Sequence, residues 1–293
     1  MNKFNKSPLW ESNFDSEIFT NFNIETFKNE GANNKIAQYS SKTHSILFLK
    51  NILFNMANNL DVNFLKLLNK IKNRSLGGGI TINFNGINCD LDYLLAIGEL
   101  QFLDTILISS KKIMEIGAGY GRTCHSILST KKNIQNYYII DLPEMLILSK
   151  IYLQKVLNNE NYVKIKFISI FEIEDIETDL IINIDSMQEM DHNVFLNYLK
   201  YINTNTKNFY CKNTVGKFAP ELCGWEKNDN SISALNSGLL KDQLNIFNPE
   251  ELLIAQDKFL IKFLPTSLWK ITKHPTTSPW SHYYQALFSK ISN

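Results

Sequence analysis

A glycine-rich segment in the middle of the chain carries the residue types best suited to bind a nucleoside. It follows a short apolar run and reads Glu115-Ile116-Gly117-Ala118-Gly119-Tyr120-Gly121. Glycines permit positive φ angles and let a ligand approach the backbone closely, and a helix that begins after such a turn offers unpaired N–H groups. Asp141 stands twenty residues after Gly121. A carboxylate at a strand end there can accept hydrogen bonds from both hydroxyls of a ribose.

Two cofactors share this arrangement, a dinucleotide and S-adenosylmethionine. The dinucleotide fingerprint is G-x-G-x-x-G, whereas this chain has G-x-G-x-G and lacks the third glycine position. Glu115, at the strand end before the first glycine, would repel a pyrophosphate but suits a sulfonium ligand with an α-amino group. The charge therefore favours S-adenosylmethionine.

Two alternatives to an S-adenosylmethionine-dependent enzyme stay open. An NAD-dependent oxidoreductase or epimerase would need a Tyr-x-x-x-Lys pair on a helix. Tyr162 and Lys166 have that spacing, but we expect them along extended chain, about 13 Å apart. A non-catalytic partner that keeps the fold without its cofactor is the other alternative.

The elements that must position this segment follow from the rhythm of the chain after residue 111. We expect strands at 112–116, 137–141, 163–168, 180–185 and 209–212, and helices at 122–129, 143–157 and 193–201. Two closing strands are expected at 268–272 and 283–288. Strands and helices that alternate at this spacing predict a parallel sheet covered on both faces, with ligands at the carboxyl ends of its strands.

The first part of the chain has a different pattern, which predicts a mainly helical region over residues 1–108. Apolar residues recur at helical spacing within 46–56 and 64–71, and Asp90 is suited to cap a helix that runs through Leu107. Alternation around Asn85-Gly86 predicts a small hairpin near 80–87. We expect this region to cover an acceptor site or to build a homodimer, and residues 109–293 to form the cofactor-binding catalytic domain.

Three stretches resemble a known family, the bacterial sugar O-methyltransferases, which are a branch of the class I S-adenosylmethionine-dependent enzymes. The stretches are 114–123, Tyr137-Tyr138-Ile139-Ile140-Asp141-Leu142-Pro143 and 183–190. The resemblance implies an α/β, Rossmann-like sheet of seven strands with the last strand antiparallel, here behind a helical N-terminal extension. It also implies methylation of a sugar hydroxyl, often in capsule or lipopolysaccharide biosynthesis. Residues 1–75 carry no such resemblance.

In class I enzymes the residues after the third strand contact adenine, which adds Ile170 and Phe171 to the predicted cofactor contacts. The complete set is Glu115, Gly117, Ala118, Gly119, Tyr120, Asp141, Leu142, Ile170 and Phe171.

A sugar hydroxyl needs a group that removes its proton while the new bond forms. Asp185, at the end of the fourth strand, and Glu189, four residues later, are candidates for the base, a substrate contact or a metal ligand. His282, before Tyr283-Tyr284, is a further candidate base beside rings that could stack on a sugar. A divalent metal such as Mg²⁺ could instead orient two vicinal hydroxyls, and the sequence does not decide between these routes.

The composition limits the classes of partner. The formal net charge is +1, so no global field favours nucleic acid or an anionic membrane. No segment is apolar and long enough to span a bilayer, and residues 1–14 lack the apolar core of a secretory signal. We therefore expect a cytoplasmic enzyme whose partner is a sugar or nucleotide-sugar substrate.

Overall fold

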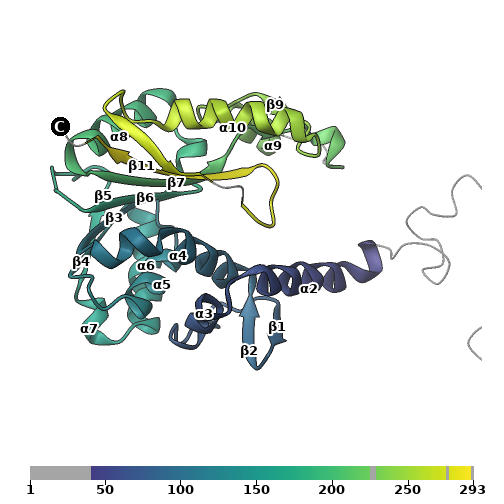
Figure 1. The fold of residues 1–293 in the computed structure, drawn as a ribbon, viewed down its shortest axis with the longest axis horizontal. Coiled ribbons are helices and arrows are strands. Elements are labelled where there is room, and N and C mark those ends of the chain that lie inside the picture. Colours follow the sequence, from purple (N-terminus) through teal and green to yellow (C-terminus); the bar gives the residue numbers. More distant parts are fainter. Residues whose placement is uncertain (1–40, 225–228, 275–276, 292–293) are drawn as a thin grey trace, which may run out of the picture.

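A seven-stranded sheet forms the centre of the computed structural model, which describes residues 41–224, 229–274 and 277–291 (Figure 1). Five strands are parallel: β3 (Lys112–Ile116), β4 (Asn136–Asp141), β5 (Ile165–Ser169), β6 (Leu180–Ile184) and β7 (Asn208–Thr214). The strand order is β10-β11-β7-β6-β3-β4-β5. The last strand, β11 (Tyr283–Lys290), is antiparallel to both β7 and β10 (Trp269–Lys273). The predicted seven-stranded sheet with an antiparallel last strand is confirmed.

Helices cover both faces of this sheet (Figure 1). One face carries α4 (Leu91–Ser109), α5 (Arg122–Thr130) and α6 (Pro143–Val156), and the other carries α8 (His192–Asn205) and α10 (Pro249–Phe263). Every residue of β6 is buried, as expected for a strand with helices on both sides. The smaller elements are α7 (Asn159–Tyr162), η3 (Met187–Glu189), β8 (Lys217–Phe218), η4 (Pro220–Leu222), α9 (Asp229–Asn236) and β9 (Gln243–Leu244).

The described part of the N-terminal region is helical with one small hairpin, as predicted. It comprises α2 (Ser41–Asn59), α3 (Val62–Leu65), η2 (Lys66–Asn69), β1 (Thr81–Phe84) and β2 (Ile87–Asp90). The hairpin turns at Asn85 and Gly86, whose φ angles of 51° and 81° are those of a tight turn with two left-handed residues. Asp90 caps α4, because its Oδ1 accepts a hydrogen bond from Tyr93 N at 3.0 Å. Residues 1–40 of the predicted helical region lie outside the described residues.

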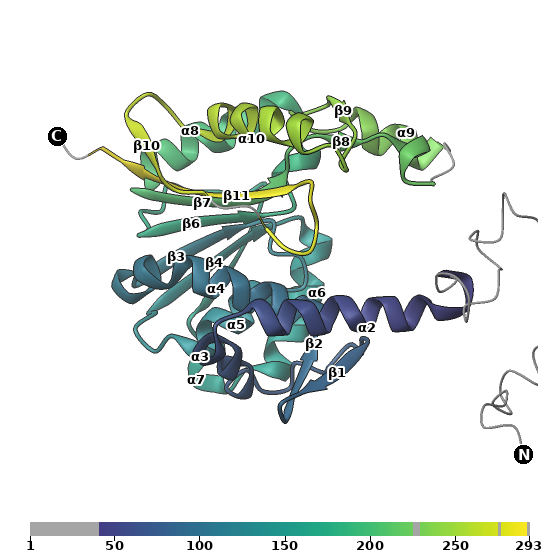
Figure 2. The same ribbon diagram turned by 45° about the vertical axis from the view of Figure 1, so that its right-hand side comes forward.

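The N-terminal helices and the sheet share one hydrophobic core. A single cluster of buried side chains contains Leu53 of α2, Leu100 of α4, Ile127 of α5 and Ile182 of β6. Beyond this shared core, α2 projects away from the body of the molecule (Figure 2). The predicted boundary between residues 108 and 109 falls at the last residues of α4, and the division into two domains stays a prediction.

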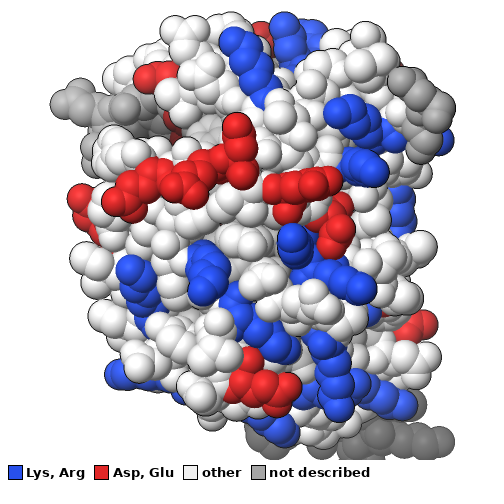
Figure 3. Space-filling model, turned by 90° about the vertical axis from the view of Figure 1, so that its left-hand side faces the viewer, with Lys and Arg blue, Asp and Glu red and all other residues white. Residues whose placement is uncertain are grey.

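The surface at the left of Figure 1 mixes both signs of charge. Acidic groups form a band across the upper half of this face, and basic groups are scattered mainly below it (Figure 3). No continuous basic surface covers this face. None of the described helices has the length and apolar character needed to cross a membrane.

Candidate active site

A cavity of about 480 Å³ lies at the carboxyl ends of β3, β4 and β6. We call it the donor cavity. It brings together nine of the predicted site residues, namely Glu115, Gly117, Ala118, Gly119, Tyr120, Asp141, Leu142, Asp185 and Glu189. The sheet explains this grouping, since parallel strands end at the same edge.

The three glycines of the loop after β3 play different parts. Gly117 has a φ of 72°, and a Cβ atom there would lie 2.1 Å from Ser186 Oγ. A Cβ atom at Gly121 would lie 2.7 Å from Leu153 Cδ1. At Gly119, with a φ of 56°, a Cβ atom would meet nothing within 4 Å. The loop is thus packed against protein at two glycines and leaves open space beside the third, which lines the donor cavity.

Asp141 ends β4 and holds the glycine loop in place. Its Oδ2 accepts a hydrogen bond from Gly119 N at 2.9 Å, and its Oδ1 accepts one from Leu142 N at 2.8 Å. Burial raises the pKa of this carboxyl, while the backbone N–H donors oppose the rise. Each carboxylate oxygen can accept a further hydrogen bond, so the group can still bind a diol.

Glu115 lies at the floor of the donor cavity and is only 2% exposed. The Tyr137 hydroxyl donates a hydrogen bond to its Oε2 at 2.7 Å. Burial raises the pKa of Glu115 to about 7, although hydrogen bonds from Tyr137 and Thr123 oppose the rise. A cationic ligand beside this carboxyl would favour its ionised form.

The segment after β6 is fixed by a buried amide. Asn183 Nδ2 donates to Ile116 O at 2.9 Å, and Asn183 Oδ1 accepts from Asn213 Nδ2 at 2.9 Å. These bonds join the ends of β3, β6 and β7, and they anchor the turn that presents Asp185 to the cavity. Asp185 has a φ of 63°, and its backbone N–H donates to Lys212 O at 3.0 Å.

The side chain of Asp185 reaches the solvent of the cavity, yet protein atoms surround its carboxyl group. This desolvation raises its pKa, while a hydrogen bond with the Tyr283 side chain and the charge of Lys212 oppose the rise. Glu189 ends the short helix η3 on the same side of the cavity and is exposed. The raised pKa of Asp185 favours its carboxylate as a proton acceptor.

A buried ion network links α4 to the sheet, and its central residue, Glu99, was not among the residues predicted from the sequence. Arg122 Nη2 lies 2.9 Å from both carboxylate oxygens of Glu99, and Lys212 Nζ lies 2.9 Å from Oε1. Glu99 is 3% exposed. Burial alone would raise its pKa, but Arg122 and Lys212 outweigh that effect and hold the pKa below its usual value. The signal that could have found it is a carboxyl group flanked by apolar residues, in the stretch Leu94-Leu95-Ala96-Ile97-Gly98-Glu99-Leu100.

The donor cavity is strongly acidic. Six carboxyl groups line it against two basic groups; the acids are Asp92, Glu99, Glu115, Asp141, Asp185 and Glu189, and the bases are Arg122 and Lys212. Both bases pair with the same carboxylate, Glu99, and the other five carboxyl groups of the described wall would repel a pyrophosphate. The charge suits a cationic ligand.

The structure does not bring the other three predicted residues into this cavity. Ile170 N donates to Asp141 O at 3.1 Å, but its side chain packs against the core on the α8 face. Phe171 is 80% exposed. His282 lines a separate cavity of about 180 Å³ together with Lys217, and burial lowers its pKa. The neighbouring Tyr283 also lines the His282 cavity, and its contact with Asp185 connects that cavity to the donor cavity.

Neither a metal centre nor the oxidoreductase pair is formed by the described residues. Within the described ranges, no three His, Cys, Asp or Glu side chains are grouped so that they could hold a metal ion. Tyr162 ends α7 and Lys166 lies in β5, so these two residues do not share a helix.

Comparison with known proteins bears on the fold. No profile of a known protein family matches the chain, and no curated protein sequence matches it. A similar solved structure is the methyltransferase domain of bacterial CtHen1, with 13% identity, 66% of this chain and 96% of that chain covered, and a TM-score of 0.49. Mitomycin 7-O-methyltransferase MmcR has 11% identity over 68% of this chain and 57% of that chain, with a TM-score of 0.42.

The glycopeptide N-methyltransferase MtfA, solved with S-adenosyl-L-methionine, has 10% identity over 67% of this chain and 87% of that chain, with a TM-score of 0.45. The sheet of this chain is defined by the order of its strands and by its reversed last strand. Those two features give the chain the Rossmann-like fold of class I methyltransferases.

Proposed function

We propose that this chain is an S-adenosylmethionine-dependent O-methyltransferase that acts on a sugar hydroxyl, in a nucleotide sugar or in a surface-glycan precursor. The observation that carries the proposal is the acidic cavity at the strand ends, which six carboxyl groups and two basic groups line. S-adenosylmethionine would supply an electrophilic methyl group there. Its charge, which is positive at the sulfur and at the α-amino group, matches the cavity.

The residues around the glycine loop fit such a cofactor. The open space beside Gly119 lets a ligand lie against the backbone. The carboxylate of Asp141 can accept hydrogen bonds from both ribose hydroxyls. Glu115 would face the α-amino group, and its ionisation would then be favoured by the ligand.

Asp185 is the group that we assign to proton removal from the acceptor hydroxyl. Desolvation of its carboxyl group raises its pKa, which makes it a stronger base than an aspartate in bulk water, and the contact with Tyr283 orients the carboxyl. General-base catalysis of this kind is worth roughly 10²–10⁴-fold in rate. Most of the remaining catalysis would come from holding the acceptor oxygen in line with the methyl group.

Calorimetry with S-adenosylhomocysteine and with NAD tests the cofactor. We expect the chain to bind S-adenosylhomocysteine but not NAD, and Asp141→Ala to weaken that binding. Asp104→Asn is the matched control, because Asp104 pairs with Lys131 and does not line the donor cavity. Binding of NAD alone would overturn the proposal, and binding of neither ligand would favour a non-catalytic partner.

Methyl transfer from labelled S-adenosylmethionine to a panel of nucleotide sugars and glycosides tests the reaction. Each assay is run with Mg²⁺ and with EDTA, which also decides the metal requirement. We expect Asp185→Asn to keep S-adenosylhomocysteine binding and to lower turnover by about 10²-fold or more. Glu189→Ala and His282→Ala are measured beside it, and full activity of Asp185→Asn with loss in either of these would move the base to that residue.

A further inference from the structure

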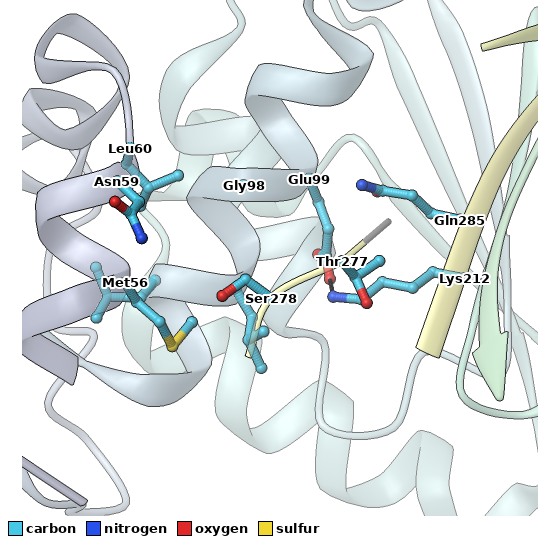
Figure 4. A pocket seen from close by; sticks show the side chains of 11 residues that line it. Met56, Asn59, Leu60, Gly98, Glu99, Lys212, Thr277, Ser278 and Gln285 are labelled. Carbon is cyan, nitrogen blue, oxygen red and sulfur yellow. Dashed lines mark hydrogen bonds and ion pairs between the residues drawn. The ribbon is translucent and has the colours of Figure 1, made fainter. Parts of the chain in front are cut away.

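A second cavity, of about 140 Å³, adjoins the donor cavity (Figure 4). It lies between α2, α4 and the segment that leads from β10 to β11. Leu95, Glu99 and Lys212 line both cavities, so the two share a wall. A molecule held in the second cavity would therefore lie next to the donor cavity.

Gly98 is the most informative residue of this second cavity. It lies in the interior of α4, where glycine lowers helix stability relative to alanine. Its backbone is not left-handed, and a Cβ atom there would come no closer to another residue than 3.9 Å, to Leu60 Cδ2. The packing of the described protein therefore does not require glycine at this position. What the glycine provides is space on the cavity wall.

At its polar end the second cavity is lined by one carboxylate and one ammonium group, those of Glu99 and Lys212. Lys212 Nζ pairs with Glu99 Oε1 at 2.9 Å, and Glu99 also pairs with Arg122, which lies outside the lining of this cavity. Thr277 and Gln285 lie close to the Glu99–Lys212 pair (Figure 4). Hydroxyl and amide groups around a closed ion pair suit hydroxyl groups of a ligand. Among the described residues that line the cavity, Lys212 is the basic one, and its ammonium group is already paired with Glu99.

The opposite end of the cavity is largely apolar. Met56 of α2 and Leu60, which follows α2, line this end (Figure 4). Leu94 of α4 also lines the cavity. A sugar ring has the matching character, with hydroxyl groups at its rim and C–H groups on its faces.

We propose that the second cavity binds the uncharged glycosyl ring that carries the accepting hydroxyl, in the space left by Gly98. This inference rests on the proposed methyl transfer and names the acceptor class for it. Any phosphate of the acceptor stays outside this cavity. The described part of the N-terminal region supplies one wall of the acceptor site through Met56, Asn59 and Leu60.

Substitutions that fill the cavity test the assignment. Gly98→Leu places a side chain in the space, and Gly98→Ala is its control with the same change of helix propensity but little volume. Asn59→Phe narrows the cavity from an exposed position of α2, and Asn58→Phe adds the same ring at an exposed neighbour that does not line the cavity. Thermal unfolding checks that all four variants fold.

The probes are methyl glycosides of hexoses, 6-deoxyhexoses and pentoses. Saturation-transfer NMR measures their binding, and uptake of labelled methyl groups measures their methylation. We expect at least one glycoside to bind the wild type. Gly98→Leu and Asn59→Phe should weaken its binding, or raise its KM, at least about tenfold. Both control variants should remain within twofold of the wild type, and S-adenosylhomocysteine binding should be unchanged in all four.

Three results would overturn the inference. The first is unchanged glycoside binding by Gly98→Leu and Asn59→Phe, and the second is that the wild type binds no uncharged glycoside. The third is methylation of phosphorylated sugars at the wild-type rate by Gly98→Leu and Asn59→Phe. The proposed function would fail differently, through a wild type that does not bind S-adenosylhomocysteine. Glycoside binding by NMR does not depend on that cofactor, so the two failures are distinguishable.

Discussion

Glu115 is a carboxyl group whose burial works against its ionisation. Its pKa lies at about 7 in the folded chain, against 4.5 for an ordinary glutamate. Between these two pH values the folded chain keeps the proton that the unfolded chain loses, so the contribution of Glu115 to stability is lost as the pH rises. Glu115→Gln cannot lose a proton. We expect the unfolding free energy of Glu115→Gln, taken relative to that of the wild type, to increase by about 2 kcal/mol from pH 5 to pH 8.

Urea unfolding of the wild type and of Glu115→Gln at pH 5 and at pH 8 measures the difference between their unfolding free energies. A constant difference between wild type and variant would show that Glu115 titrates normally.

Gly117 and Gly119 should respond differently to the same added methyl group. Gly117→Ala forces a Cβ atom to within 2.1 Å of Ser186 Oγ, so we expect a loss of several kcal/mol in unfolding free energy. Gly119→Ala meets no neighbour and should cost only the roughly 1–2 kcal/mol of a left-handed alanine. Its methyl group would instead occupy the donor cavity and weaken S-adenosylhomocysteine binding.

Denaturant unfolding and calorimetry on both variants separate the two effects. Ser186→Gly should partly restore the stability of Gly117→Ala and should leave Gly119→Ala unchanged. Equal stability losses in the two glycine variants would contradict the clash.

The sequence predicted the donor side of the site better than the buried network beside it. Glu115, the glycines and Asp141 are set by local spacing along two consecutive strands and the loops that follow them. Glu99 is different, because its partners Arg122 and Lys212 lie 23 and 113 residues away along the chain. No local pattern encodes contacts of that kind.

At the scale of elements, α4 joins the N-terminal region to the site through Glu99. Glu99→Gln removes the anion between two buried cations, which should cost about 3–5 kcal/mol at neutral pH. Because the pKa of Glu99 is held below its usual value of 4.5, this stability is present above that pH and is lost as the pH falls through the lowered pKa. The gap between wild type and variant should therefore narrow in acid.

Asp104→Asn is the control for this measurement by denaturant unfolding. Asp104 also pairs with a lysine, at 2.6 Å, but its side chain is 37% exposed. Its loss should cost less than about 1 kcal/mol. If Glu99→Gln and Asp104→Asn lowered the unfolding free energy equally, the buried Glu99 network would have no special role in stability.

Most elements of the sheet could be predicted because apolar runs and turns alternate regularly from β3 to β7. The helix α10 was not predicted, although its start carries recognisable signals. Asn248 Oδ1 accepts from Glu250 N at 3.0 Å, and Pro249 occupies the first turn. The short strands β8 and β9 have two residues each. Such strands depend on tertiary pairing and leave little trace in a sequence.

At the scale of the whole molecule, the shared core predicts that the N-terminal helices and the sheet unfold together. Leu53 of α2 is fully buried in the same cluster as the strands. Leu53→Ala should cost about 2–5 kcal/mol, and hydrogen exchange in α2 and in β6 should report the same loss. Ile46→Ala, at a position of α2 that is 58% exposed, should change stability by less than about 0.5 kcal/mol. Loss of protection in α2 alone would show two independent units.

The imbalance of charge in the donor cavity also acts before any contact is made. A concave site lined by carboxyl groups concentrates its field at the mouth, so it draws a diffusing cation inward and slows the approach of anions. Capture of a positively charged ligand should thus be faster in dilute buffer and slower as salt is added, while a neutral analogue arrives at the same rate in both. The cavity would in this way select its ligand by association rate as well as by the complementarity of the bound state.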